Sequence, residues 1–210
     1  MKKSADQRNS HLLLHDRSFL DQGFLSLAGV DEAGCGPLAG PVVASAVIVR
    51  DFSFSAPVDD SKKLTASARQ RAYEEIMQKC VVGTGVVDSP LIDKLNIYQA
   101  TLRAMEEAVV KLGQAPGAIL VDGPKAPNLP FRQFPIVDGD AISSSIACAS
   151  IVAKVTRDRM MEYYAHLHPR YGFEKHKGYG TRDHMEAIKK YGPCKIHRRS
   201  FEPVKSWFSE

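Results

Sequence analysis

The sequence has no long hydrophobic run and few cysteines. No apolar stretch among its 210 residues reaches the roughly 18 residues that a transmembrane helix needs. Near the start only three leucines (12–14) stand together, which is too short for the core of a signal peptide, so we expect a cytoplasmic protein. The four cysteines lie far apart and form no Cys-x-x-Cys pair, which argues against a zinc ribbon and favours free thiols. Repeats and low-complexity segments are also absent, which excludes fibrous and disordered classes.

Charge is nearly balanced over the whole chain, at a net +4, but it is unevenly distributed. Residues 154–205 carry 13 Lys and Arg against 6 Asp and Glu, whereas the rest of the chain carries 15 against 18. Five of the seven histidines also lie in residues 154–205. A basic segment on a near-neutral body is typical of a surface that binds a polyanion, although a solvated helix surface has the same composition.

Apolar periodicity predicts alternating strands and helices from Leu25 onward. Strands are expected over residues 25–32, 42–50, 80–87, 117–123 and 131–137. Helices are expected over residues 66–79 with Thr65 as N-cap, over 89–112 with Ser89 as N-cap and Pro90 at the first helical position, over 141–165 and over 181–191. This alternation is typical of an α/β fold with a mixed sheet. Residues 1–24 are expected to form a polar, loosely attached N-terminal arm, and residues 25–210 the folded domain.

Three carboxylates stand where predicted strands end. Asp31 and Glu32 close one strand and precede a turn rich in glycine and proline, and Asp122 closes another strand. Adjacent side chains of a regular strand face opposite sides, so the chain must bend for Asp31 and Glu32 to serve one site, and the glycines permit that bend. Carboxylates at strand ends commonly form a functional rim because burial of an unpaired carboxylate is costly. Taken singly, each is also a common turn or capping residue.

The helix expected at 141–165 carries a polar stripe. Ser150, Lys154 and Asp158 recur every four residues and therefore share one helical face. The stripe is either a solvated face with a Lys154–Asp158 ion pair or the wall of a polar site, since the rest of the helix is apolar. Carboxylates without a histidine–cysteine cluster favour Mg²⁺ or Mn²⁺, and two such ions support phosphodiester hydrolysis.

A series of motifs, in order along residues 25–205, resembles type 2 ribonucleases H, the bacterial ribonuclease HII family. The motifs are AGVDEAGCGPLAGPVV (28–43), DSKKL (60–64), LNI (95–97), VDG (121–123), ASIVAKVTRD (149–158), HKGYGT (176–181) and HRRSF (197–201). The resemblance implies a ribonuclease H-like mixed β-sheet flanked by helices, with a small, basic helical C-terminal portion over about residues 165–210. It implies cleavage of RNA in RNA–DNA hybrids and incision on the 5′ side of single ribonucleotides in duplex DNA, which leaves 3′-hydroxyl and 5′-phosphate ends.

The resemblance also assigns roles to residues. It implies that Asp31, Glu32, Asp122 and Asp158 hold two Mg²⁺ or Mn²⁺ ions. It implies that the main chain around Gly34 and Gly36 reads the ribose 2′-hydroxyl, the group that distinguishes RNA from DNA, and that Tyr179 stacks on the sugar at the RNA–DNA junction. The further positions that it implies for binding or supporting the substrate are Lys62, Lys63, Asn96, Ser150, Lys154, Lys177, Arg198 and Arg199.

One position departs from the family pattern, which usually has arginine between the two glycines where this chain has Cys35. We therefore expect retained cleavage with altered affinity or junction preference, and a hybrid-binding protein with weakened catalysis is an alternative. A ribonuclease HIII is disfavoured because that family normally has an additional N-terminal domain, whereas 30 residues precede Asp31. A dinucleotide-binding enzyme is disfavoured because the glycine spacing does not fit and prolines interrupt the required helix. We expect a monomer that binds RNA–DNA duplexes, with no convincing sliding-clamp motif in residues 206–209.

Overall fold

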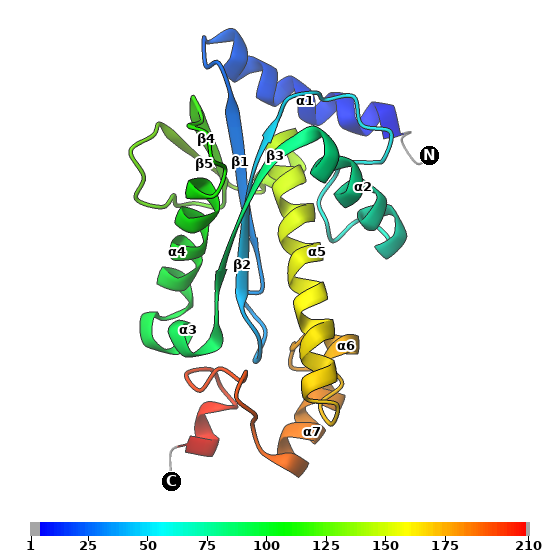
Figure 1. The fold of residues 1–210 in the computed structure, drawn as a ribbon, viewed down its shortest axis with the longest axis vertical. Coiled ribbons are helices and arrows are strands. Elements are labelled where there is room, and N and C mark those ends of the chain that lie inside the picture. Colours follow the sequence, from blue (N-terminus) through cyan, green and yellow to red (C-terminus); the bar gives the residue numbers. More distant parts are fainter. Residues whose placement is uncertain (1–4, 209–210) are drawn as a thin grey trace.

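The computed structural model describes residues 5–208, with side chains from Leu12 onward, so parts of the expected N-terminal arm and C-terminal tail lie outside it. Five strands form one sheet in the order β3-β2-β1-β4-β5 (Figure 1). Their bounds are β1 Leu27–Ala33, β2 Val42–Val49, β3 Cys80–Val87, β4 Ala118–Asp122 and β5 Gln133–Ile136. Strands β1, β2 and β3 pair antiparallel, whereas β1–β4 and β4–β5 pair parallel. The predicted mixed sheet is confirmed.

Helices cover both faces of the sheet. Helix α4 (Ile97–Val110) packs on one face, while α5 (Ser144–Leu167) packs on the other beside α2 (Ala66–Lys79) (Figure 1). Every residue of β2 is buried, which explains its near-continuous run of alanine, valine and isoleucine. The sheet therefore lies between two apolar layers, and polar groups collect where its strands end.

Gly29 in β1 determines how close α5 approaches the sheet. A Cβ atom at this position would lie 2.0 Å from the main-chain carbon of Ser145, in the first turn of α5. Only glycine permits this approach, because any side chain would collide with the helix backbone. As a result, the ends of β1 and the first turns of α5 lie against each other, which places Asp31 beside the helix.

The helix expected over residues 89–112 is two helices, α3 (Ser89–Leu95) and α4, which meet at Asn96. Asn96 has a φ of 69° and its side chain accepts a hydrogen bond from the N–H of Gln99, so it caps α4. The N-cap of α3 is Asp88, not Ser89. The Ser89 hydroxyl instead lies 2.6 Å from the carbonyl oxygen of Ile196 and ties α3 to the C-terminal portion.

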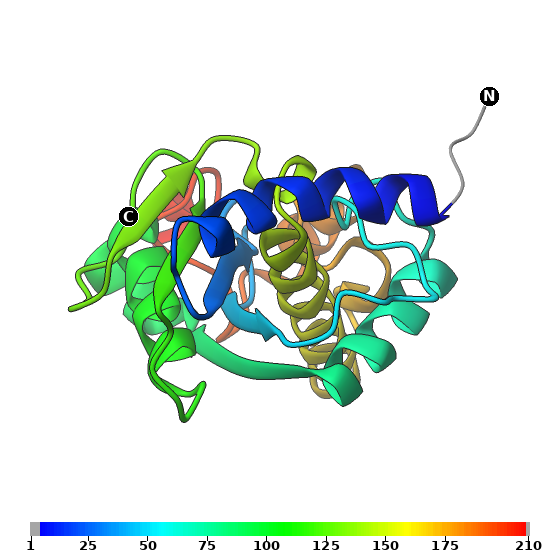
Figure 2. The same ribbon diagram turned by 90° about the horizontal axis from the view of Figure 1, so that it is seen from above.

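Most of the N-terminal segment is helix α1 (Ala5–Asp21) rather than a loosely attached arm. Asp16 is fully buried and accepts hydrogen bonds from the Ser143 hydroxyl at 2.6 Å and the Ser145 N–H at 2.8 Å. These contacts dock α1 across the start of α5 (Figure 2). The polar composition of the segment hid this role, because a buried carboxylate that caps a helix looks like a surface residue in the sequence.

The C-terminal portion is helical, as expected. Beyond the sheet, α5 continues toward α6 (Phe173–His176), α7 (Arg182–Tyr191) and the short helix η2 (Lys205–Phe208), which gather at one end of the molecule (Figure 1). In the part of the chain that the structure describes, no helix is both long enough and apolar enough to span a membrane.

Candidate active site

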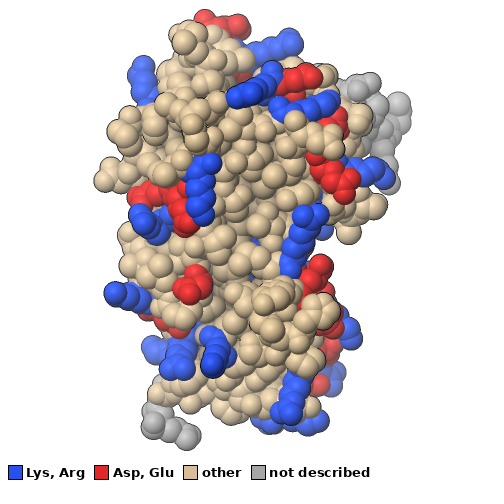
Figure 3. Space-filling view, viewed as in Figure 1, with Lys and Arg blue, Asp and Glu red and all other residues tan. Residues whose placement is uncertain are grey.

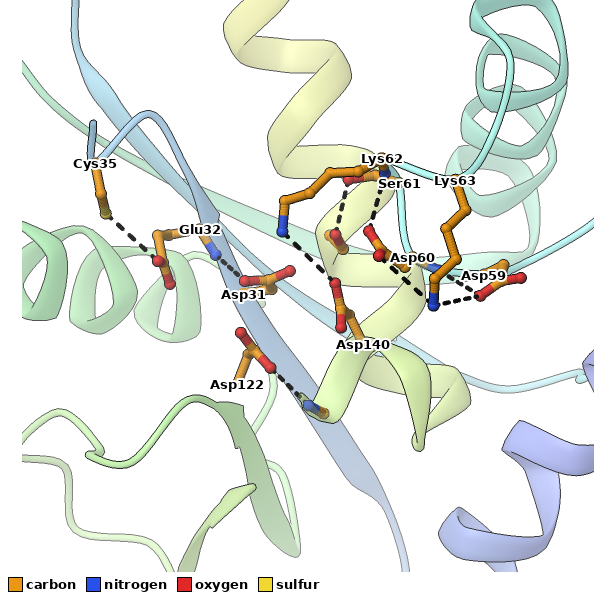
Figure 4. A network of polar contacts seen from close by, with 12 residues as sticks. Asp31, Glu32, Cys35, Asp59, Asp60, Ser61, Lys62, Lys63, Asp122 and Asp140 are labelled. Atoms are coloured by element: carbon orange, nitrogen blue, oxygen red, sulfur yellow. Dashed lines mark hydrogen bonds and ion pairs between the residues drawn. The ribbon is translucent and has the colours of Figure 1, made fainter. Parts of the chain in front are cut away.

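Asp31, Glu32 and Asp122 meet at the ends of neighbouring parallel strands, β1 and β4 (Figure 4). Asp31 is only 4% exposed, and its Oδ1 accepts a hydrogen bond from the Glu32 N–H at 2.6 Å. Burial, with Glu32 and Asp122 close by, raises the pKa of Asp31 well above its usual range, although a hydrogen bond from Ser150 opposes that rise. Burial also raises the pKa of Glu32. The raised pKa values mean that the ionised forms of Asp31 and Glu32 are unfavourable in the protein alone, because no cationic group fully compensates them.

The structure adds Asp140, which the sequence reading missed. The Gly139 N–H donates to Asp122 Oδ1 at 2.7 Å, and this contact holds the short helix η1 (Gly139–Ala141) against the end of β4. Burial, followed by the charges of Asp60 and Asp122, raises the pKa of Asp140 to about 6. Lys62 offsets part of this charge, with its Nζ 4.0 Å from Asp140 Oδ2. The sequence signal that could have indicated Asp140 is the Asp138-Gly139-Asp140 turn, which stands directly before the buried helix α5.

Asp158 is not brought to these carboxylates. Its Oδ1 pairs with Lys154 Nζ at 2.7 Å, as the plainer reading of the stripe expected. Ser150 does lie in the site, where its hydroxyl bonds to that of Ser61 at 3.0 Å and contacts Asp31. Asp158 follows Ser150 by eight residues, which corresponds to about 12 Å along the axis of α5, so the two residues share a helix face but lie at different positions along the axis. The carboxylate that the structure places near Asp122 is thus that of Asp140, whereas the role of Asp158 as a metal ligand stays a prediction.

The Cys35 side chain points toward Glu32 (Figure 4). Its thiol donates to Glu32 Oε1 at 3.4 Å and lies 3.3 Å from Thr101 Oγ1. Burial, followed by the charge of Glu32, raises the pKa of the thiol to about 12. The side chain lines a largely apolar cavity of about 320 Å³ between the carboxylates and α4. Cys35 thus contacts a site carboxylate, a role that the sequence did not indicate.

The loop that follows β1 packs against the HKGYGT segment. The Leu38 N–H donates to the Gly178 carbonyl, and a Cβ on Gly36 would lie 3.8 Å from the Tyr179 ring. Tyr179 is 47% exposed, so its ring stands at the surface beside Gly36, and its stacking on a sugar stays a prediction.

Three neighbouring histidines, His176, His184 and His197, support the main chain at Tyr179. His184 Nδ1 donates to the Tyr179 carbonyl at 2.9 Å, and its Nε2 lies 3.1 Å from Nε2 of His197. The Cys194 N–H donates to His197 Nδ1, which makes His197 Nε2 the donor to His184. His176 stacks on His184 with ring centroids 4.4 Å apart. Burial lowers the pKa of His184 and of His197 to about 4, so both rings are neutral in this arrangement.

The predicted basic contacts fall into different environments. Arg198 is completely buried and donates to main-chain carbonyls, so it is not a direct phosphate contact. Arg199 is exposed, with its guanidinium 4.5 Å from the Phe208 ring centroid. Lys63 lies near Asp59 and Asp60, and Lys177 pairs with Glu162 at 2.8 Å. On the face shown in Figure 3, lysine and arginine side chains are interspersed with acidic ones and form no single patch.

A five-stranded mixed sheet with helices on both faces, and with carboxylates gathered at the ends of its parallel strands β1 and β4, defines a nuclease of the ribonuclease H-like class. The family model for ribonuclease HII matches residues 28–204. The chain belongs to the ribonuclease HII family and is therefore a ribonuclease H hydrolase that acts on RNA–DNA hybrids. The ribonuclease HIII and dinucleotide-binding alternatives are set aside.

Relatives and solved structures agree with this family. The chain is 54% identical to ribonuclease HII of Syntrophus aciditrophicus over 192 residues, and this matched stretch covers 91% of this chain and 90% of the relative. Ribonuclease H2 of Pyrococcus horikoshii superposes with a TM-score of 0.74 at 25% identity, over 87% of this chain and 97% of that one. Ribonuclease HII of Archaeoglobus fulgidus, solved in complex with PCNA, superposes with a TM-score of 0.73 at 26% identity, over 85% of this chain and 96% of that one.

Proposed function

We propose that this ribonuclease is a metal-dependent endonuclease that also nicks duplex DNA on the 5′ side of single ribonucleotides, leaving 3′-hydroxyl and 5′-phosphate ends. The observation that carries the proposal is the gathering of Asp31, Glu32, Asp122 and Asp140 around one point at the end of the sheet (Figure 4). Such a cluster needs a cationic partner, because like charges this close disfavour joint ionisation.

The donor set suits Mg²⁺ or Mn²⁺, since every candidate ligand is a carboxylate oxygen. Within residues 5–208, no three His, Cys, Asp or Glu side chains already have the arrangement of a finished metal site. We therefore propose that Asp31, Glu32, Asp122 and Asp140 complete their arrangement when ions bind. Two such ions would supply an activated water and stabilisation of the leaving oxygen.

The surrounding residues support this chemistry by orienting the carboxylates. Ser150 bonds to Asp31, and the Gly139 N–H holds Asp122. Lys62 is largely exposed beside Asp140, where it can also meet a substrate phosphate. We propose that the main chain from Gly34 to Gly36 reads the 2′-hydroxyl while Tyr179 packs on the adjacent sugar. A monomeric state and the absence of clamp binding stay predictions.

The test is a duplex DNA with one ribonucleotide, incubated with Mg²⁺ or Mn²⁺. We expect nicking by the native protein and loss of nicking, by about 100-fold or more, in Asp31→Asn and in Asp140→Asn. Asp158→Asn is the matched control and should keep most of the activity. Loss in Asp158→Asn with retention in Asp140→Asn would restore the sequence-based assignment. Tight duplex binding by the native protein without nicking would favour the weakened hybrid-binding alternative.

A further inference from the structure

Two fully buried arginines hold the loop that follows β1. Arg157 in α5 is 1% exposed and Arg198 is 0% exposed, although arginine is almost never buried to this extent without a charged partner. Within the described residues, neither guanidinium forms an ion pair with a carboxylate. Since an uncompensated buried charge is costly, this arrangement calls for a specific reason.

The partners of both arginines are main-chain carbonyl groups of residues 34–41, here called the glycine loop. Arg198 donates to the carbonyls of Gly34, Cys35 and Gly40, the last at 3.0 Å from Nε. Arg157 donates to the carbonyl of Pro41 at 2.9 Å and to that of Ala39 at 3.2 Å. Five carbonyls of an eight-residue segment therefore point inward onto two planar guanidinium groups, which provide several donors in a rigid geometry.

Three N–H groups of the glycine loop have no acceptor within the described part of the protein. In the described part of the chain, the N–H groups of Gly34, Cys35 and Gly36 donate to no protein acceptor, whereas those of Leu38 and Gly40 do. Gly36 is exposed and lies beside Tyr179, and the Arg157 guanidinium lies 5.9 Å from the Tyr179 ring centroid. A Cβ on Gly34, whose φ is 101°, would lie 2.1 Å from Arg157 Nε, so the loop is fitted to this arginine.

We propose that Arg157 and Arg198 are positioning residues for ribonucleotide recognition: they hold the carbonyls of the glycine loop inward so that its free N–H groups meet the ribose 2′-hydroxyl. Burial, followed by the charge of Arg157, lowers the pKa of Arg198 to about 9, so Arg198 remains charged at neutral pH. This inference rests on the proposed function, because it concerns how that substrate is read.

The experiment compares binding of two duplexes, identical except that one contains a single ribonucleotide, by fluorescence anisotropy with Ca²⁺ in place of Mg²⁺. Arg198→Lys keeps the positive charge but cannot hold three carbonyls in one plane. We expect it to lower the preference for the ribonucleotide duplex by about tenfold, the equivalent of one lost hydrogen bond, while the affinity for all-DNA duplex stays within about twofold. Arg157→Lys should act in the same direction and serves as the second variant if Arg198→Lys does not fold.

The matched control is Arg50→Lys, at the opposite end of β2, which should change neither affinity. A purely structural role would lower both affinities together along with the thermal unfolding temperature, and a direct phosphate contact would weaken all-DNA binding equally. Either result, or an unchanged preference in both variants, would overturn the proposal. If the native protein itself shows no preference and no nicking, the proposed function has failed, which is a distinct outcome.

Discussion

Acidification should destabilise this protein through the histidines beneath Tyr179. His184 and His197 have folded-state pKa values of about 4 because they are buried, against 6.5 for an exposed histidine. Protons therefore bind the unfolded chain preferentially as the pH falls below about 6.5, and stability is lost until the pH reaches about 4. A proton on His184 Nε2 would also face the Nε2–H of His197, so the hydrogen bond between them cannot survive protonation.

The size of the effect follows from the two pKa values. Between about pH 7.5 and pH 5, one such histidine removes about 2 kcal/mol from the free energy of unfolding, and the pair about 4 kcal/mol. Urea denaturation followed by circular dichroism, at fixed Mg²⁺ and several pH values, measures this loss. His197→Gln keeps a donor toward His184 but does not titrate, so its loss over the same range should be smaller by about 2 kcal/mol.

The carboxylates contribute equally to the native protein and the variant, so the difference between their pH profiles isolates the histidine. His166→Gln, a change at an exposed histidine, is the control and should follow the native profile. Equal losses of stability in His197→Gln and the native protein would refute the reasoning, because they would show that His197 is not held neutral by the fold.

Four further predictions follow from the contacts described above. Asp31→Asn should stabilise the metal-free protein at neutral pH, since the raised pKa of Asp31 means that its ionised form is unfavourable in the fold; the gain should shrink as the pH falls and vanish below about pH 3, where the folded and the unfolded states both hold the proton, as thermal unfolding would show. Cys35→Arg must turn its new side chain outward, which should steepen the dependence of log Kd on log salt by about 0.9 for one added phosphate contact; an unchanged slope would show that position 35 does not reach the substrate. Gly29→Ala should cost about 3 kcal/mol in urea denaturation because its Cβ collides with the backbone of α5. Asp16→Ala should cost about 1–3 kcal/mol in the same assay by leaving buried donors at the start of α5 unpaired.

The strands were predictable because apolar patterning and turn residues act locally. The expected strand over residues 80–87 agrees with β3, and Thr65 caps α2 as predicted. The division of the helix at Asn96 was not predictable, because no proline or glycine marks it and a positive φ is uncommon for a residue other than glycine. The N-terminal helix was missed because its docking depends on Asp16, whose partners lie more than a hundred residues away.

The site was predictable only in part, for a similar reason. Strand ends gave Asp31, Glu32 and Asp122, because neighbouring parallel strands bring their ends together. Helical periodicity identified the face that Asp158 shares with Ser150, but it cannot say how far along the axis the site extends. The resemblance implied that Arg198 binds or supports the substrate, and only the structure shows its carbonyl partners. Asp140 depends on a turn whose position is set by its contact with Asp122.

The arginine contacts also bear on when the enzyme becomes competent during synthesis. Arg198 and Gly34 are 164 residues apart in the chain, yet they bond directly. A ribosome delivers residues in order, so the glycine loop emerges long before the group that fixes it. The last strand of the sheet ends at Ile136, so the sheet and its carboxylates have most of their partners before Arg198 emerges, whereas the glycine loop waits for Arg198. Substrate discrimination is therefore expected to be the final property that a nascent chain acquires, and C-terminal truncations should lose it before they lose the fold.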